Sequence, residues 1–162
     1  FLRFSHQKGS NHFKLNKELH LSKQQSPHAN ETNQHYCRRW ASLKVLEQIS
    51  KSNKPHEFDI QVSNYPNEGK SYLVLSSATS DPFVSNSYRS VNIGIQINSQ
   101  LKRKINFVES ASIPKAQVGV TCERCVISDC EVRQAQPTSI MSAQKDAKIA
   151  DVVNKIQEKY SK

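Results

Sequence analysis

Glycine is scarce in this sequence, with four residues among 162. Loops that wrap phosphate groups need clustered glycines, because glycine lets the backbone approach the ligand closely. The G-x-G-x-x-G, Walker A and nucleophile-elbow motifs are all missing, and neither a pair of carboxylates nor a Ser/His/Asp set stands out. We therefore expect a protein that is not an enzyme.

Long apolar runs are missing as well. No stretch approaches the roughly 18 to 20 apolar residues of a membrane helix, so we expect no membrane span. Charged residues and histidines interrupt residues 1–13, which do not resemble a signal peptide. The only methionine is Met141, which indicates a fragment or a processed product that lacks its true N-terminus. With no sign of secretion, we expect a cytoplasmic protein.

The charged residues of the sequence are mostly positive, because Lys and Arg outnumber Asp and Glu by 23 to 14 and give a net charge of +9. This charge suits an acidic partner such as nucleic acid or a phosphorylated ligand, although a basic surface without such a partner fits equally well. The length allows one domain, and the 36% of hydrophobic residues allow one modest core.

Residues 1–36 are polar and rich in histidine, and we interpret them as an arm that joins a preceding domain. A short helix is expected where Phe13, Leu15 and Leu19 fall, and residues 22–34 have the Pro, Asn and Ser content of a loop. The histidine spacing contains neither H-E-x-x-H nor an i, i+4 pair, which favours surface histidines over a metal site. The segment holds five of the six histidines, namely His6, His12, His20, His28 and His35.

From residue 38 the chain shows regular apolar periodicity. Residues 38–52 predict a helix with apolar residues at spacing three, which Lys54 and Pro55 end. A short helix capped by Ser99 and a final amphipathic helix over residues 139–160 are expected further on. Three predicted strands, over residues 57–66, 71–80 and 88–98, lie between the helix at 38–52 and the one capped by Ser99. Consecutive strands with short connections indicate an antiparallel sheet with packed helices, an α+β fold similar to GAF and PAS sensor domains.

Three of the four cysteines crowd into the segment GVTCERCVISDCEVRQAQP, at Cys122, Cys125 and Cys130. Their C-x2-C-x4-C spacing differs from the paired C-x2-C knuckles of structural zinc sites. Three local thiolates and one remote thiolate, Cys37, suit the corners of a 4Fe-4S cluster better. Zinc is the alternative. Disulfides or free thiols without a metal are the third interpretation, although nothing indicates the oxidising compartment that disulfides need.

The cysteine segment also resembles the C-terminal signature of the short-chain fatty acyl transcriptional regulators. These are bacterial regulators with an XRE-type helix-turn-helix, a metallopeptidase-like middle region and a cysteine-bearing domain at the end. The resemblance extends over roughly residues 36–137. Its motif is matched by Gly119, Cys122, Cys125, Asp129, Cys130, Arg133 and Pro137, and its opening Cys and Trp are matched by Cys37 and Trp40.

We expect three parts: a polar arm at residues 1–36, a cysteine-bearing sensor domain at 37–138 and a C-terminal amphipathic helix at 139–162. The resemblance applies to the second part and implies one metal centre whose four ligands are Cys37, Cys122, Cys125 and Cys130, used to sense redox state or a metabolite. An acyl-CoA ligand carries over only weakly, since no single residue identifies a CoA site. The alternative function is a structural zinc-binding interaction module that senses no ligand.

The partners follow from the same resemblance. DNA would be bound through a helix-turn-helix that this chain does not contain. Regulators of this kind usually bind DNA as symmetric dimers, so we expect a homodimer. The apolar stripe of the final helix is the candidate contact, and packing of that helix on its own domain is the alternative.

Overall fold

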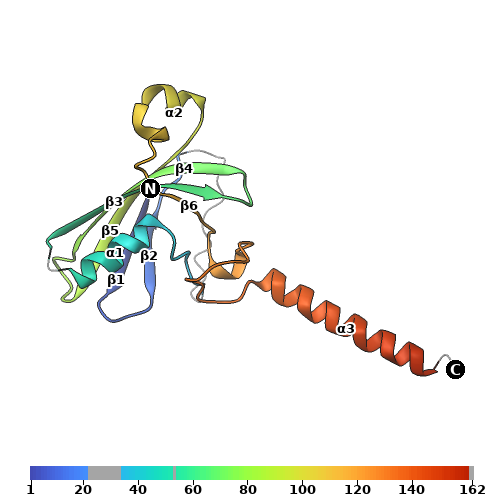
Figure 1. Cartoon of the computed structure of the whole chain (residues 1–162). Coiled ribbons are helices and arrows are strands. Elements are labelled where there is room, and N and C mark those ends of the chain that lie inside the picture. The colour runs from blue at the N-terminus through green and yellow to red at the C-terminus, as the bar shows by residue number, and fades with distance from the viewer. Residues whose placement is uncertain (22–33, 53, 161–162) are drawn as a thin grey trace.

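The computed structural model describes residues 1–21, 34–52 and 54–160. Figure 1 shows a mixed α+β body from which one long helix projects. The strands are β1 (Leu2–Gln7), β2 (Phe13–Glu18), β3 (His56–Tyr65), β4 (Lys70–Ser80), β5 (Ser87–Gln96) and β6 (Lys115–Gln117). The helices are α1 (Ala41–Lys51), α2 (Ser99–Lys104) and α3 (Thr138–Tyr160), with two 3-10 turns, η1 (Asn106–Glu109) and η2 (Cys122–Arg124).

The six strands form one sheet in the order β2-β1-β5-β4-β3-β6. All neighbours run antiparallel except β6, which pairs with β3 in parallel. The α+β class and the antiparallel run of β3, β4 and β5 are therefore confirmed. The turn between β3 and β4 contains Gly69 at φ +61°, a backbone conformation that glycine adopts without strain. The similarity to GAF and PAS domains stays a prediction.

The N-terminal segment departs from expectation. Residues predicted to form a short helix are instead strand β2, which forms a hairpin with β1, and β1 pairs along its length with β5. The apolar residues Phe13 and Leu15 stand two apart, which is the period of a strand and not of a helix. Phe4 is completely buried, with its ring against Tyr36 and Trp40, so this part of the predicted arm belongs to the sheet. The loop predicted for residues 22–34 lies largely outside the described residues.

Helix α1 covers one face of the sheet and contacts β3, β4 and β5. Its residues Leu43, Leu46 and Ile49 are fully buried, as the spacing of three predicts. The sheet face beneath it is unusually polar, because Gln61 and Asn92 are buried there. Gln61 is satisfied by Lys44, whose Nζ donates to its Oε1 at 2.8 Å.

The opposite face of the sheet is apolar but only partly covered. The segment from α2 through η1 packs over one end, where Leu73 and Val108 are buried. At the other end Val91 and Ile93 remain 42% and 49% exposed. Alternation along β5 is as predicted, but it is the polar side of the strand that faces the helix.

The cap of α2 differs from the prediction, whereas the position of α3 along the chain agrees with it. The cap of α2 is Asn98, whose side chain accepts from the backbone N–H of Leu101, and not Ser99 as predicted. Helix α3 forms where the periodicity placed it, but it extends away from the sheet (Figure 1), and Val152 and Val153 are about half exposed. None of the helices in the described ranges is long and apolar enough to cross a membrane.

Candidate metal centre and neighbouring polar pocket

A short backbone pairing brings the remote Cys37 to the cysteine segment. Tyr36 and Thr121 form an isolated antiparallel bridge. On either side of it the Cys37 N–H donates to the Val120 carbonyl at 3.1 Å, and the Cys122 N–H donates to the His35 carbonyl at 2.8 Å. This pairing holds two cysteines that are 85 positions apart in sequence (122 minus 37) on neighbouring segments of the chain.

The other two cysteines are placed by local turns. η2 reverses the chain after Cys122, and the Cys125 N–H donates to the Cys122 carbonyl at 3.2 Å. A second turn follows Cys130, whose carbonyl accepts from Arg133. Cys37, Cys122, Cys125 and Cys130 then line one small cavity of about 10 Å³. All four are free thiols in this structure.

Backbone N–H groups point at the sulfurs of this thiol cluster. Gln134 donates to Cys122 Sγ at 3.4 Å, and the backbone at Gly119 and Arg39 hydrogen bonds to the Cys37 sulfur. Burial raises the pKa of the Cys37 thiol and the neighbouring cysteines raise it further, while the two backbone hydrogen bonds oppose this. Such N–H donors stabilise thiolates and tune metal–sulfur centres.

The wall of the cluster is built from Gly119 and Trp40. A Cβ atom at Gly119 would lie 3.0 Å from Cys125 Sγ, so no larger residue fits there without displacing the thiol. Trp40 is 4% exposed, and its Nε1 donates to the Gly119 carbonyl at 2.9 Å. These two residues of the sequence motif therefore position cysteines and are not themselves ligands.

Four thiols are the donor set of both a structural zinc ion and an iron–sulfur cluster. Four sulfurs around one zinc ion lie about 3.8 Å from one another, given tetrahedral geometry and Zn–S bonds of about 2.3 Å. Within the described ranges no three His, Cys, Asp or Glu side chains form a group that could hold a single metal ion.

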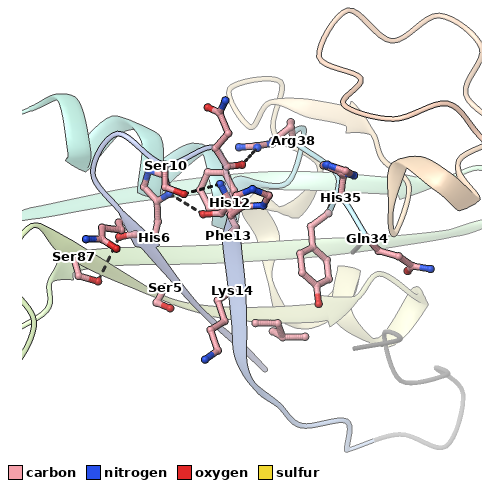
Figure 2. Close-up of a pocket in the computed structure, with 14 residues that line it drawn as sticks. Ser5, His6, Ser10, His12, Phe13, Lys14, Gln34, His35, Arg38 and Ser87 are labelled. Carbon is pink, nitrogen blue, oxygen red and sulfur yellow. Dashed lines mark hydrogen bonds between the residues drawn. The ribbon is translucent and has the colours of Figure 1, made fainter. Parts of the chain in front are cut away.

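A second, larger hollow lies between the β1–β2 hairpin and the residues that precede α1 (Figure 2). Its volume is about 660 Å³, which is within the range of ligand sites. We call it the polar pocket. No Asp or Glu is among the described residues that line it, whereas five basic or titratable side chains are: His6, His12, Lys14, His35 and Arg38.

Two of these side chains contact a carboxylate outside the pocket lining. His35 Nδ1 lies 2.8 Å from Glu123, whose carboxylate also accepts from the His35 backbone N–H, and Arg38 pairs with Glu47 at 3.2 Å. Burial acts to raise the pKa of Glu123, but the hydrogen bonds from His35 outweigh it and lower that pKa. Lys14 has no partner in the described part of the chain and supplies the free positive charge.

A comparison with models of known protein families identifies the family of this chain. The profile of the short-chain fatty acyl coenzyme A regulators, C-terminal domain, matches residues 17–153 of this chain. The chain belongs to this family. Comparisons with curated proteins and with solved structures found no match. The resemblance predicted from the cysteine segment is thus confirmed for a longer stretch than the residues that first indicated it.

Membership of the short-chain fatty acyl coenzyme A regulators places the chain among transcriptional regulators whose family name specifies an acyl-CoA ligand. The structure brings together all four predicted cysteines, and what they bind stays a prediction. Sequence reasoning missed the polar pocket. The signal was the histidine content of residues 1–36, because His6, His12 and His35 line it. Their spacing excluded a metal motif but did not indicate a shared hollow.

Proposed function

We propose that this chain is the sensory domain of a bacterial transcriptional regulator, and that it binds a short-chain acyl-CoA and holds an iron–sulfur centre on Cys37, Cys122, Cys125 and Cys130. The observation that carries the proposal is the convergence of four free thiols from two distant parts of the chain, with backbone hydrogen bonds to the sulfurs of Cys37 and Cys122. A 4Fe-4S cluster would supply redox sensitivity there, because its potential and stability depend on the hydrogen bonds to its sulfurs.

The residues of this chain have defined tasks in the centre. The pairing of Tyr36 with Thr121 fixes the distance between the remote and the local cysteines. Trp40 and Gly119 form the wall behind Cys125. The backbone N–H of Gln134 stabilises the thiolate of Cys122. Four thiolates would leave no open position for a substrate, so we propose a sensing role and no catalysis.

The polar pocket is suited to the phosphate-bearing end of the ligand. Coenzyme A carries several negative charges, and the pocket offers Lys14, His6 and His12 with no lining carboxylate among the described residues. Its volume of about 660 Å³ accommodates a nucleotide-sized group. Positive charge at such a site favours phosphate and raises the rate of association.

DNA recognition is proposed for a helix-turn-helix outside these residues, in a regulator that works in the cytoplasm, where thiols stay reduced. Dimerisation is proposed through α3. Its apolar stripe lies exposed on a helix that projects from the body, so a second copy would bury it. The stripe consists of Ile149, Val152, Val153 and Ile156.

A single titration distinguishes this function from the alternative, a structural zinc module without ligand sensing. The chain is purified without oxygen and titrated with propionyl-CoA while its visible absorption spectrum and heat of binding are recorded. We expect a broad iron–sulfur absorption band and saturable binding of the acyl-CoA. A colourless, zinc-containing chain that binds no acyl-CoA would establish the alternative.

A further inference from the structure

Two polar residues that are not cysteines border the cavity between the four thiols. Thr121 stands directly before Cys122, and Arg133 lies in the turn after Cys130, where its backbone N–H donates to the Cys130 carbonyl at 3.2 Å. Both line the cavity together with the cysteines. A neutral hydroxyl and a permanently charged guanidinium are not ligands in thiolate sites, so these residues can influence the centre only through hydrogen bonds and charge.

Each of the two residues has a buried polar atom whose hydrogen bonding is unmet. Thr121 is 1% exposed, and its Oγ1 has no partner in the described part of the chain. The Nη1 atom of Arg133 is likewise buried without a partner there, although its Nη2 donates to the Ile127 carbonyl. A buried donor without an acceptor is unfavourable, so the two atoms indicate that a partner joins them in the functional state.

Metal binding supplies such a partner, because it changes the chemistry of the four sulfurs. A neutral thiol is a weak hydrogen-bond acceptor, whereas the thiolate is the form that binds metal and carries a negative charge. Four thiolates together bring about twice the charge of one Zn²⁺ ion. A loaded centre therefore presents strong acceptors and excess negative charge to the cavity that Thr121 and Arg133 line.

We propose that Thr121 and Arg133 are the side-chain donors that stabilise the loaded metal centre. Thr121 Oγ1 and Arg133 Nη1 donate to its sulfurs, and the guanidinium offsets part of its negative charge. This inference rests on the four-cysteine centre of the proposed function and applies to zinc and to an iron–sulfur cluster alike. The two residues tune and hold the centre without binding the metal themselves.

Arg133 is a better source of this charge than Arg38, which also borders the cavity. The Arg38 guanidinium lies 3.2 Å from the Glu47 carboxylate and 4.3 Å from the centre of the Phe13 ring, so its charge is already engaged. Arg133 has no ion pair with a carboxylate in the described part of the chain. Its bond to the Ile127 carbonyl fixes the guanidinium to the loop between the second and third cysteines of the segment.

Thr121→Val tests the hydroxyl, because valine resembles threonine in shape but cannot donate. In metal-free chain the variant should be at least as stable to denaturant as the wild type, since the hydroxyl that it removes has no partner there. Its metal affinity, measured by chelator competition, should fall about tenfold. A residue that only packs would lose in both measurements. Thr121→Ser keeps the hydroxyl and should keep the wild-type affinity.

Arg133→Met tests the charge, because methionine is long and unbranched but has neither a charge nor an N–H donor. Metal affinity should fall about 10- to 100-fold. The sulfur-to-metal charge-transfer band should move to longer wavelength, because positive charge and hydrogen bonds lower the energy of the sulfur electrons. Co²⁺ serves as the probe metal if the wild type holds zinc, which has a filled d shell and no such visible band.

Two further variants control this test. Arg133→Lys keeps the positive charge and should recover most of the affinity and of the band position. Arg124→Met is the matched control, because Arg124 is an exposed arginine next to Cys125 that does not line the cavity. Solvent and salt screen an exposed charge, so this variant should retain both wild-type values. Equal losses in Arg124→Met and Arg133→Met would overturn the inference.

The outcomes separate this inference from the proposed function. A wild-type chain that holds no metal would refute the centre itself and the inference with it. A loaded wild type whose affinity and band are unchanged in both Thr121→Val and Arg133→Met would refute the two donors and leave the centre intact. Circular dichroism of metal-free chain checks the fold, and Thr121→Val alone decides if Arg133→Met does not fold.

Discussion

Replacing Cys37 by serine separates the two structural consequences of a four-cysteine centre. Cys37 is the ligand that ties the start of α1 to the cysteine segment, so a metal bound to it closes a loop of 85 residues (122 minus 37). The loop-closure relation for a covalent crosslink of that length gives about 4 to 5 kcal/mol of stabilisation. Cys130→Ser removes one ligand too, but Cys37, Cys122 and Cys125 still close the long loop.

The expected result is a difference between the two variants. In the metal-loaded chain Cys37→Ser should lower the free energy of unfolding by about 4 kcal/mol more than Cys130→Ser does. In metal-free chain the gap should shrink to about 1 to 2 kcal/mol, which reflects a buried hydroxyl in place of a thiol that is 6% exposed. Chemical denaturation without oxygen, with and without a chelator, measures both quantities.

Equal losses in the two variants would refute the reasoning. That result would mean that Cys37 does not share the centre with the other three cysteines. A gap of the same size in metal-free chain would also contradict it, because packing around Cys37 and not loop closure would then account for the stability.

Three further changes test the surroundings of the centre. Glu123→Gln should lower the free energy of unfolding by about 1.5 to 3 kcal/mol at neutral pH, because it weakens the hydrogen bonds to His35. The pKa of Glu123 is lowered in the folded state, so this stabilisation is present above the usual pKa of 4.5 and is lost as the pH falls through the lowered pKa. Thermal unfolding measured against pH should therefore show the wild type and the variant converging in acid. Gly119→Ala should weaken metal affinity about 10- to 100-fold by crowding Cys125 Sγ, measured by chelator competition, and unchanged affinity would contradict the close contact. Val153→Glu should shift the chain toward monomer with unchanged circular dichroism; a wild type that is monomeric by light scattering at tens of micromolar would remove α3 as the dimer contact.

The periodicity of apolar residues was sufficient to predict the helices and strands that follow it strictly. β5 alternates Val91, Asn92, Ile93 and Gly94, and α1 repeats apolar residues at spacing three, so both formed where predicted. The alternation could not tell which side of β5 would be covered, because that depends on where α1 docks. The buried side is the one that carries Asn92.

The hairpin at the N-terminus was missed for a different reason. Phe13 and Leu15 have the period of a strand, but Leu19 four residues later also permits a helix, and single strands gain stability only from their neighbours. β1 is held by β5, more than 80 residues away, a pairing that local sequence does not encode. β6 is shorter still, with three residues, and depends entirely on its parallel pairing with β3.

The grouping of Cys122, Cys125 and Cys130 could be predicted from their spacing alone, and the metal that they bind stays a prediction. C-x2-C-x4-C requires local turns, and the structure supplies one in η2. The participation of Cys37 came from family resemblance, since nothing in the spacing links it to residues 85 positions away. The bridge between Tyr36 and Thr121 now gives the physical reason for that link.

Metal and sulfide content tests the central claim most directly. The chain is purified without oxygen, and iron, acid-labile sulfide and zinc are measured for the wild type and for Cys122→Ser. The account predicts about four iron and about four sulfide ions per chain, lost in the variant. About one zinc ion without sulfide would contradict the iron–sulfur assignment, and a wild-type chain with no bound metal and four freely reactive thiols would contradict the centre itself.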